Sequence, residues 1–324
     1  MSISAKEKNK PSSSEVVEDG KEGIAIDEKK YMRTEWNKGG KKGYKQAKRV
    51  TILMRSAERV DRIFGSSWTH NEKFMNKVYP TDMNVPKCAT LHPHFYQNNP
   101  PITCIGKYAT QLNARALKNY GVYPSIIYCS PTLRTIQTAA AMAKCNGAKV
   151  CVEPGLLEPL DWYKNAGLKK LPEFMEEGMH GMNIDEGYKP ILSMSEMRQQ
   201  FGVKTQDDCA QRIMFVVKNL CGLDRESVAC IVGHAITIDI ATKLASQSIP
   251  PSMDVDELTS FEDPLYCVDP AGQCSKLELG VRYPPGCIMA VQRLNDGPPY
   301  ILQTIPDIIP PLTIGKFSNK ILKY

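Results

Sequence analysis

The chain has 324 residues, of which 42% are hydrophobic and 23% are charged, as is typical of a globular protein and not of a fibrous one. Its net charge of +6 is too small to indicate a specific nucleic-acid partner. No apolar run reaches the length of about 18 residues that crosses a bilayer, and the amino terminus lacks the apolar core of a signal peptide. We therefore expect no membrane partner and a location in the cytoplasm, with the nucleus as an alternative.

The cysteines of the chain are predicted to be reduced thiols. There are 11 of them, several within apolar runs, and no two form a C-x-x-C pair. An odd number without paired spacing argues against a disulfide framework and is typical of a cytoplasmic or nuclear protein. A zinc site built from Cys267, Cys274 and Cys287 is conceivable, but the spacing of these residues is irregular. The sequence therefore predicts neither a metal nor a cofactor.

Residues 1–48 are rich in Lys, Glu, Ser and Gly and show almost no apolar periodicity, so they are predicted to be a disordered tail. The last part of this tail is basic, with no acidic residue from Lys38 to Arg49. Such charge is typical of a solvated lead-in, and a basic address for an anionic partner or for the nucleus is the alternative. We place one folded domain at residues 49–317 and a short C-terminal tail at residues 318–324.

The folded domain is predicted to alternate between buried strands and amphipathic helices. Short apolar runs of strand length occur at residues 50–54, 125–129, 149–152, 228–232 and 287–294. Apolar residues at helical spacing predict helices over 103–120, 133–141, 206–220, 236–245 and 254–261. This alternation favours an open α/β sheet, with the strand at 287–294 pairing at its edge.

Two segments lack a regular hydrophobic period and are predicted to be insertions. Residues from about 66 to 100 contain Trp, Asn, Pro and His without a repeat, and residues from about 160 to 205 are rich in Met, Gly and Pro. Long loops inside a compact domain are usually functional or disordered. We expect these two to act as lids that set the choice of ligand.

Cationic side chains follow the first two predicted strands. Arg55 and Arg59 come directly after the first strand, and Arg134 lies in the first turn of the helix after the second. Ser130 is predicted to be the N-cap residue of that helix, and Pro131 is predicted to be its first helical residue. Backbone N–H groups and the helix dipole favour an anion beside Arg134.

Two further polar residues follow the other strands, since Glu158 comes after the third and His234 directly after the fourth. Because the C-terminal ends of the strands of an open α/β sheet lie on one edge, all these groups are expected to converge. Three arginines and a histidine near a helix N-terminus are typical of a site for a dianion such as phosphate, and a neighbouring carboxyl can protonate a leaving oxygen. Each residue alone has a plainer interpretation, because a strand-end histidine is often a core residue and Arg134 can pair with a surface acid.

Four motifs of the chain resemble those of the histidine phosphatase (phosphoglycerate mutase-like) superfamily, at residues 55–59, 128–139, 152–158 and 231–235. The chain is similar in particular to the branch formed by the phosphatase domains of the suppressor of T-cell receptor signalling (ubiquitin-associated and SH3 domain-containing) proteins. The segment Glu58-Arg59-Val60-Asp61, Trp68 and the segment Pro310-Pro311-Leu312-Thr313 fit that branch. The resemblance covers about residues 50–316 and implies a three-layer α/β/α sandwich with a mostly parallel central sheet. A homodimer is expected by this resemblance alone.

The resemblance also implies a role for each residue of the expected site. The residues that would bind the phosphoryl group are Arg55, Arg59, Arg134 and His234, and the proton donor would be Glu158. The nucleophile of the superfamily is the histidine of an Arg-His-Gly-Glu-Arg motif, and this chain has Ser56 at that position. Ala57 stands at the position of the glycine, where its methyl group is expected to narrow the approach of the backbone to a ligand.

The serine decides the functional hypothesis. A serine hydroxyl is a weak nucleophile unless a positioned base removes its proton, and a phosphorylated serine would be a stable ester. The main hypothesis is therefore a pseudophosphatase, which binds phosphate or a phosphorylated (phosphotyrosine-type) protein or small molecule without turnover. The alternative is a weakly active phosphomonoesterase or protein tyrosine phosphatase that uses water or Ser56, with His234 as the base. A third interpretation is a structural protein whose pocket charges only stabilise the fold.

Overall fold

The computed structural model describes residues 49–65, 68–70, 83–88, 96, 98–119, 121–172, 182–201, 206–223, 227–246, 283–295 and 302–304. The strands within these ranges are β1 (Val50–Arg55), β2 (Ile126–Cys129), β3 (Lys149–Val152), β4 (Ala229–Gly233), β5 (Ile288–Arg293) and β6 (Leu302–Thr304). The α-helices are α4 (Val60–Phe64), α7 (Cys104–Asn119), α8 (Leu133–Ala143), α9 (Leu160–Asn165), α10 (Met194–Gln200), α11 (Gln206–Gly222) and α12 (Ala235–Ser246), and the short 3₁₀ helices are η2 (Trp68–His70) and η4 (Pro154–Leu156). The predicted tails at 1–48 and 318–324 and the predicted helix at 254–261 lie outside the described residues.

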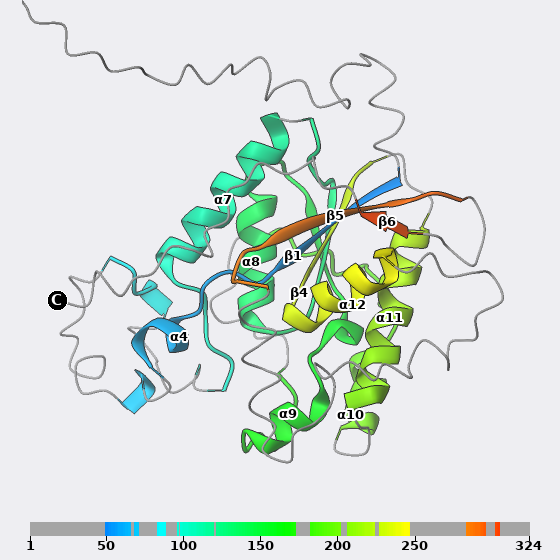
Figure 1. The fold of residues 1–324 in the computed structure, drawn as a ribbon. Coiled ribbons are helices and arrows are strands. Elements are labelled where there is room, and N and C mark those ends of the chain that lie inside the picture. The colour runs from blue at the N-terminus through cyan, green and yellow to red at the C-terminus, as the bar shows by residue number, and fades with distance from the viewer. Residues whose placement is uncertain are drawn as a thin grey trace, which may run out of the picture.

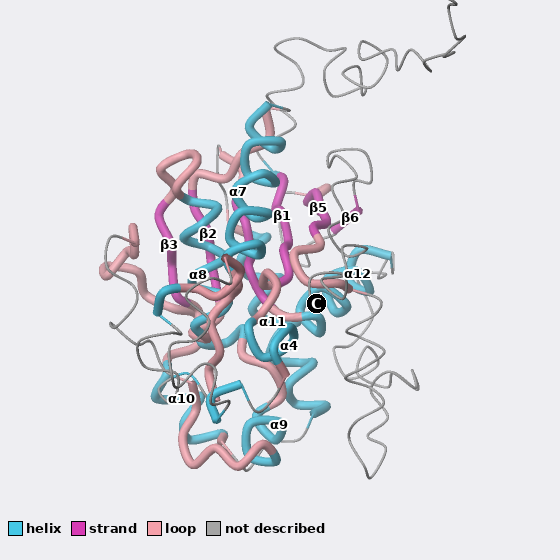
Figure 2. The backbone as a smooth tube through the Cα atoms, turned by 90° about the vertical axis from the view of Figure 1, so that its left-hand side faces the viewer, coloured by secondary structure: helices cyan, strands magenta, loops and turns pink. Residues whose placement is uncertain are grey.

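The described strands form a six-stranded sheet in the order β3-β2-β4-β1-β5-β6. The first four of these strands pair in parallel, whereas β5 pairs antiparallel with β1 and with β6. Figure 2 shows β3 at one end of the sheet and β6 at the other. The predicted mostly parallel sheet is confirmed, but the prediction that the strand at 287–294 pairs at the edge is wrong. The outermost strand next to β5 is β6, which is too short to give a recognisable hydrophobic period in the sequence.

Helices cover both faces of the sheet, with α7 and α8 on one face and α11 and α12 on the other (Figure 1), so the three-layer arrangement is confirmed. Side chains of a strand point alternately to its two faces. In β1, Ile52 and Met54 pack with α7 and α8, whereas Leu53 packs with α11 and α12. All three side chains are fully buried. A strand that is covered on both faces needs a continuous apolar run, which is why the sequence predicts this strand so clearly.

The segment predicted to be irregular from about 160 to 205 contains two short helices, α9 and α10. The helix α10 begins with a capping box, in which the Ser193 hydroxyl accepts from the Glu196 N–H and the Glu196 carboxylate accepts from the Ser193 N–H. This S-x-x-E spacing is a signal in the sequence for the start of that helix. Both helices contribute to a separate small core made of Leu157, Leu160, Tyr163, Leu171 and Met197. That core fixes α9 beside the edge of the sheet where β3 ends.

The C-terminal ends of the four parallel strands lie level with one another. In the register of the sheet, Arg55 is opposite Gly233, and Cys129 is opposite both Val152 and Val232. The residues that follow these strands therefore begin close together, although they are far apart in the sequence.

The described cysteines form no disulfide. No group of His, Cys, Asp and Glu among the described residues is arranged to hold a metal ion. Cys267 and Cys274, which belong to the conceivable zinc site, lie outside the described residues.

Within the described part of the chain, none of the helices combines the length and the apolar character that a membrane span requires.

Candidate functional site

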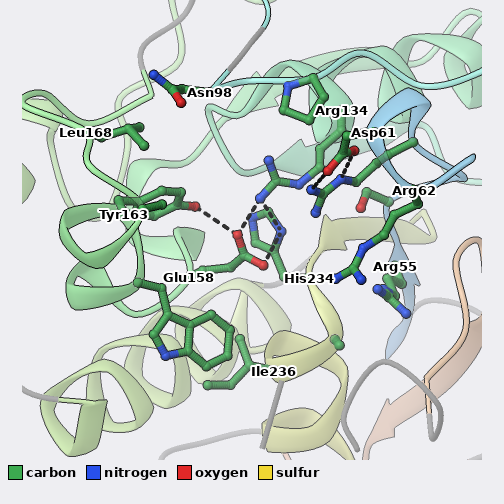
Figure 3. Close-up of a pocket in the computed structure, with 16 residues that line it drawn as sticks. Arg55, Asp61, Arg62, Asn98, Arg134, Glu158, Tyr163, Leu168, His234 and Ile236 are labelled. Carbon is green, nitrogen blue, oxygen red and sulfur yellow. Dashed lines mark hydrogen bonds and ion pairs between the residues drawn. The ribbon is translucent and has the colours of Figure 1, made fainter. Parts of the chain in front are cut away.

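A cavity of about 300 Å³ lies at the C-terminal edge of the parallel strands. Its lining includes all the site residues named from the sequence, which are Arg55, Ser56, Arg59, Arg134, Glu158 and His234. These residues come from the connections after β1, β2, β3 and β4. The structure therefore brings all six together around one cavity, part of which is shown in Figure 3.

Arg55, the last residue of β1, is held by a segment that comes from far along the chain. Its backbone N–H donates to the carbonyl oxygen of Cys287 at 2.9 Å, and its Nη1 donates to the carbonyl oxygen of Tyr283. The Tyr283 hydroxyl donates at 3.0 Å to Oδ1 of Asp239, a buried residue of α12. Burial lowers the pKa of Arg55 to about 10, which still leaves its guanidinium charged at neutral pH.

Ser56 and Ala57 point in different directions. Ser56 lines the cavity, is only 4% exposed, and donates its backbone N–H to the carbonyl oxygen of Gly233 at 2.9 Å. Its hydroxyl forms no hydrogen bond with the residues that the structure describes. Ala57 does not line the cavity, because its methyl group lies against α7, where a Cβ atom built on Gly106 would approach it to 3.3 Å. The Ala57 methyl group therefore does not narrow the space for a ligand in the cavity, contrary to the expectation from the sequence.

Arg59 is neutralised by a carboxylate that the sequence analysis did not single out. Its Nε donates to Oδ1 of Asp61 at 2.8 Å, and its Nη2 donates to Oδ2, so the pair is bidentate. Burial alone would lower the pKa of Arg59, but the attraction of Asp61 outweighs burial and raises it. Burial would likewise raise the pKa of Asp61, but the attraction of Arg59 outweighs burial and lowers this pKa. An anion that binds Arg59 must therefore share it with Asp61.

Arg134 and His234 share the carboxylate of Glu158. The Nη2 of Arg134 donates to Oε2 of Glu158 and lies 3.4 Å from Nδ1 of His234. The same Nδ1 lies 3.5 Å from Oε1 of Glu158. The hydroxyl of Tyr163, on α9, donates to Oε2 of Glu158 at 3.1 Å. Figure 3 shows the carboxylate between these three side chains, at the centre of the cavity wall.

The charge states of this cluster follow from burial and from the arginines. Burial lowers the pKa of His234 to about 3, so its imidazole is neutral at neutral pH. Burial would raise the pKa of Glu158, but the attraction of His234, Arg134 and Arg59 outweighs it and holds this pKa well below its usual value. Since His234 is itself neutral at pH 7, the arginines carry that attraction there. Glu158 is therefore a carboxylate in this structure and carries no proton to donate.

Ser130 holds the other side of the imidazole, and its predicted role as an N-cap is wrong. The helix α8 begins at Leu133 with Thr132 as its N-cap residue, so Pro131 also lies outside the helix. The Ser130 hydroxyl instead lies 3.0 Å from Nε2 of His234. The reason is the sheet order, because β2 and β4 are neighbours and the residues after them face each other. Both ring nitrogens of His234 therefore have partners among Ser130, Glu158 and Arg134.

Arg212, on α11, supports the turn that carries Glu158. Its Nη1 donates to the carbonyl oxygen of Gly155 at 2.6 Å, and its Nη2 donates to the carbonyl oxygen of Glu158 at 3.1 Å and to Sγ of Cys209 at 3.0 Å. The side chain is only 7% exposed. Arg212 was not predicted as a site residue, although a cation on the apolar face of α11, one residue before Ile213, is unusual in the sequence.

The lining of the cavity also contains an apolar wall and a further cation, Arg62, and neither was predicted as part of the site. The apolar wall consists of Trp162, Ala166, Leu168 and Ile236, next to Tyr163. Figure 3 shows Tyr163 and Leu168 across the cavity from Arg55 and Arg62. Trp162, Ala166 and Leu168 come from α9 and the residues that follow it, a segment without periodic signal, and Ile236 comes from α12. The arrangement offers positive charge on one side and an apolar surface on the other.

Comparison with known proteins gives a family and several relatives. A model of the histidine phosphatase superfamily (branch 1) matches residues 92–256, a range that includes Arg134, Glu158 and His234 but not the segment from Arg55 to Arg59. The ubiquitin-associated and SH3 domain-containing protein A of Homo sapiens is 28% identical over 205 residues, which are 61% of this chain and 31% of that protein. The ecdysteroid-phosphate phosphatase of Drosophila melanogaster is 27% identical over 221 residues, which are 63% of this chain and 28% of that protein.

A solved structure shares the fold. The crystal structure of the ecdysone phosphate phosphatase of Bombyx mori in complex with tungstate superposes with a TM-score of 0.53 at 23% sequence identity, over 84% of this chain and 99% of that one. The two curated relatives above are much longer proteins, and this chain matches less than a third of the length of each, 31% and 28%.

Proposed function

The chain belongs to the histidine phosphatase superfamily (branch 1), and we propose that it binds phosphorylated ligands in the cavity without hydrolysing them, as a pseudophosphatase. One observation carries the proposal. The four residues proposed to contact a phosphoryl group, Arg55, Arg59, Arg134 and His234, line one cavity together with Ser56. By the resemblance of residues 55–59 to the Arg-His-Gly-Glu-Arg motif, Ser56 stands where the superfamily has its nucleophile.

Electrostatics supports the binding part of the proposal. Arg55 is held by a neutral carbonyl group, and Arg59 and Arg134 each face one carboxylate. The described lining of the cavity contains four arginines and two carboxylates, Asp61 and Glu158, and a dianion would compensate the excess positive charge. Arginine also presents its donors in a fork that matches the oxygens of a phosphoryl group. The crystal structure of the related Bombyx mori phosphatase is itself a complex with an oxyanion, tungstate.

The geometry around Ser56 supports the absence of turnover. A serine attacks phosphorus only when a base takes its proton. His234 is the base that the rival hypothesis requires, yet its Nε2 faces Ser130 and its Nδ1 faces Glu158 and Arg134. Glu158, which would protonate the leaving oxygen, is held as a carboxylate with a pKa well below its usual value. The site is therefore not prepared for attack by Ser56, which needs a base, whereas an imidazole at that position would not need one.

The apolar wall supports an aromatic phosphoryl ligand of the phosphotyrosine type. Trp162, Leu168 and Ile236 face the same cavity as the arginines. Ligand sites typically combine such apolar walls with a few placed polar groups, and an aromatic ring gains free energy against them. An aryl phosphate would place its phosphoryl group among the arginines and its ring against this wall.

The experiment measures binding and turnover separately on the unaltered chain. We expect saturable binding of vanadate and of a phosphotyrosine peptide, both lost in Arg134→Ala, together with no hydrolysis of p-nitrophenyl phosphate or of the peptide. Turnover by the unaltered chain that disappears in His234→Ala would instead favour the weakly active phosphomonoesterase. No saturable binding at all would leave only a structural role for the charges.

A second experiment restores the nucleophile. We expect Ser56→His to raise the hydrolysis of p-nitrophenyl phosphate by at least about a hundredfold over the unaltered chain, because a missing nucleophile costs several tenfold steps. Since the Ala57 methyl group lies against Gly106 and not in the cavity, the double variant with Ala57→Gly should add little. The control combines Ser56→His with Arg134→Ala and should remain inactive. No activity in either histidine variant would mean that more than the nucleophile has been lost.

A further inference from the structure

Arg62 is the outermost of the four arginines that line the cavity, and it lies on α4. Its side chain is exposed, and Figure 3 shows its guanidinium beside that of Arg55, across the cavity from Tyr163 and Leu168. Its charge acts on the site, because repulsion from Arg62 adds to the burial that lowers the pKa of Arg55 to about 10. Arg62 is therefore close enough to the inner arginines to contact the same ligand.

The three inner arginines each donate a side-chain hydrogen bond to another described residue, whereas Arg62 lies near a carboxylate, that of Asp61, which Arg59 already holds. Arg59 pairs with Asp61, Arg134 pairs with Glu158, and Arg55 donates to a backbone carbonyl group. Within the part of the chain that the structure describes, Arg62 forms no salt bridge. Two neighbouring like charges, Arg55 and Arg62, repel each other until an anion lies between them. At the mouth of the cavity, Arg62 attracts only a carboxylate that is already paired with Arg59, so its guanidinium can bind an incoming anion.

We infer that Arg62 binds a second anionic group of the ligand, next to the phosphoryl group held by the inner arginines. This inference rests on the proposed function and narrows its ligand class. The ligand is an aryl phosphate with a carboxylate nearby, either on an acidic residue beside a phosphotyrosine or on a small molecule.

The position of the apolar wall agrees with this assignment. An aromatic ring that packs against Trp162 and Leu168 extends from the phosphoryl group toward the mouth of the cavity. Arg62 lies on the opposite side of that mouth, so a carboxylate attached to the ligand beyond its ring reaches the guanidinium from solvent. An exposed ion pair of this kind is worth up to about a fivefold gain in affinity, and salt screens it.

The test uses paired probes that differ by one charge. The probes are two phosphotyrosine peptides, one with Glu and one with Gln beside the phosphotyrosine, together with phenyl phosphate and 4-carboxyphenyl phosphate. Dissociation constants are measured by calorimetry for the unaltered chain, for Arg62→Gln and for Arg115→Gln. Arg115, exposed on α7 and outside the cavity, is the control for the loss of one positive charge.

We expect the unaltered chain and Arg115→Gln to bind the charged member of a pair about threefold more tightly, and Arg62→Gln to bind both members equally. A preference in the peptides alone assigns the carboxylate to a protein, and a preference in the aryl phosphates alone assigns it to a small molecule. If Arg62→Gln weakens both members by the same factor, Arg62 binds the phosphoryl group itself and the inference is overturned. Equal binding of both members by the unaltered chain also overturns it. Absence of binding to every probe overturns the proposed function, and the inference with it.

Discussion

Two glutamates on the same connection after β3, Glu153 and Glu158, have opposite surroundings. Glu153 is fully buried. Its carboxylate accepts only from neutral groups, which are the Tyr188 hydroxyl at 2.8 Å and the backbone N–H groups of Gly155, Ile191 and Leu192 at 3.0, 2.7 and 3.1 Å. The Glu158 side chain is 20% exposed and faces Arg134, His234 and the cavity.

The difference shows what separates a structural carboxylate from a functional one. Glu153 closes a turn and fixes a segment almost forty residues away, and nothing from solvent can replace it. Glu158 is held by groups that any incoming anion would also attract, so its contacts are exchangeable. Burial alone does not separate the two glutamates, because both are largely covered. The charge of the partners and the access to the cavity separate them.

The largest effect that would test this difference between the two glutamates is expected from Glu153→Ala. The substitution leaves three backbone N–H groups and the Tyr188 hydroxyl without their acceptor, at about 1–3 kcal/mol for each buried donor that finds no water. We expect the free energy of unfolding in urea to fall by about 3–5 kcal/mol. The control Tyr188→Phe removes one donor and should cost about 1 kcal/mol. A loss below 1 kcal/mol in Glu153→Ala would mean that water replaces the carboxylate.

Arg212 connects the turn next to Glu153 with Glu158, since it donates to the carbonyl oxygens of both Gly155 and Glu158. Arg212→Met keeps the length of the side chain and removes these donors. We expect a loss of about 2–3 kcal/mol in the free energy of unfolding, because two carbonyl groups of the turn lose their donor. The exposed control Arg115→Met should change it by less than about 0.5 kcal/mol. An unchanged stability in Arg212→Met would show that the turn holds its shape without the guanidinium.

The sequence predicts the parallel strands and the six residues after them, because buried strands are continuous apolar runs and their ends share one edge. It does not distinguish Glu153 from Glu158. Both follow β3 in a turn of the same composition, and their difference arises from residues 188–192, which fold back over Glu153 alone. Asp61 and Tyr163 were missed for a similar reason. Nothing in their local pattern shows that they face Arg59 and Glu158.

The surroundings of Glu158 also differ from those of Glu153 in containing a histidine, His234, whose pKa is lowered. We expect this shift to make the stability of the protein depend on pH. His234 has a pKa of about 3 in the folded state, against about 6.5 when unfolded. Between these values the unfolded chain binds the proton and the folded chain does not. Stability therefore falls as the pH falls through this window, by up to about 1.4 kcal/mol per pH unit.

We expect the unaltered chain to lose about 1–2 kcal/mol more than His234→Asn when the pH is lowered from 6.5 to 5, in urea unfolding at each pH. The asparagine keeps a polar side chain at that position and cannot bind a proton. Titrating groups that do not interact with His234 contribute equally to both proteins and cancel in the difference, and the pKa of Glu158 lies well below this pH window. Parallel pH profiles of the two proteins would contradict a neutral, buried His234.

The smallest effect, and the most direct test of exchangeable contacts, is expected from Glu158→Gln. The amide removes a negative charge that competes with the ligand for Arg134, so inorganic phosphate and vanadate should bind about threefold to tenfold more tightly, or about 1 kcal/mol. Glu196→Gln, on the solvent side of α10, is the matched control and should leave affinity unchanged.

Because the pKa of Glu158 lies well below its usual value, the ratio of the affinities of Glu158→Gln and the unaltered chain should stay constant from pH 8 to pH 5. A ratio that vanishes at pH 5 would mean that the carboxyl is already protonated there. Weaker binding by the glutamine variant would contradict a competition between Glu158 and the anion for Arg134.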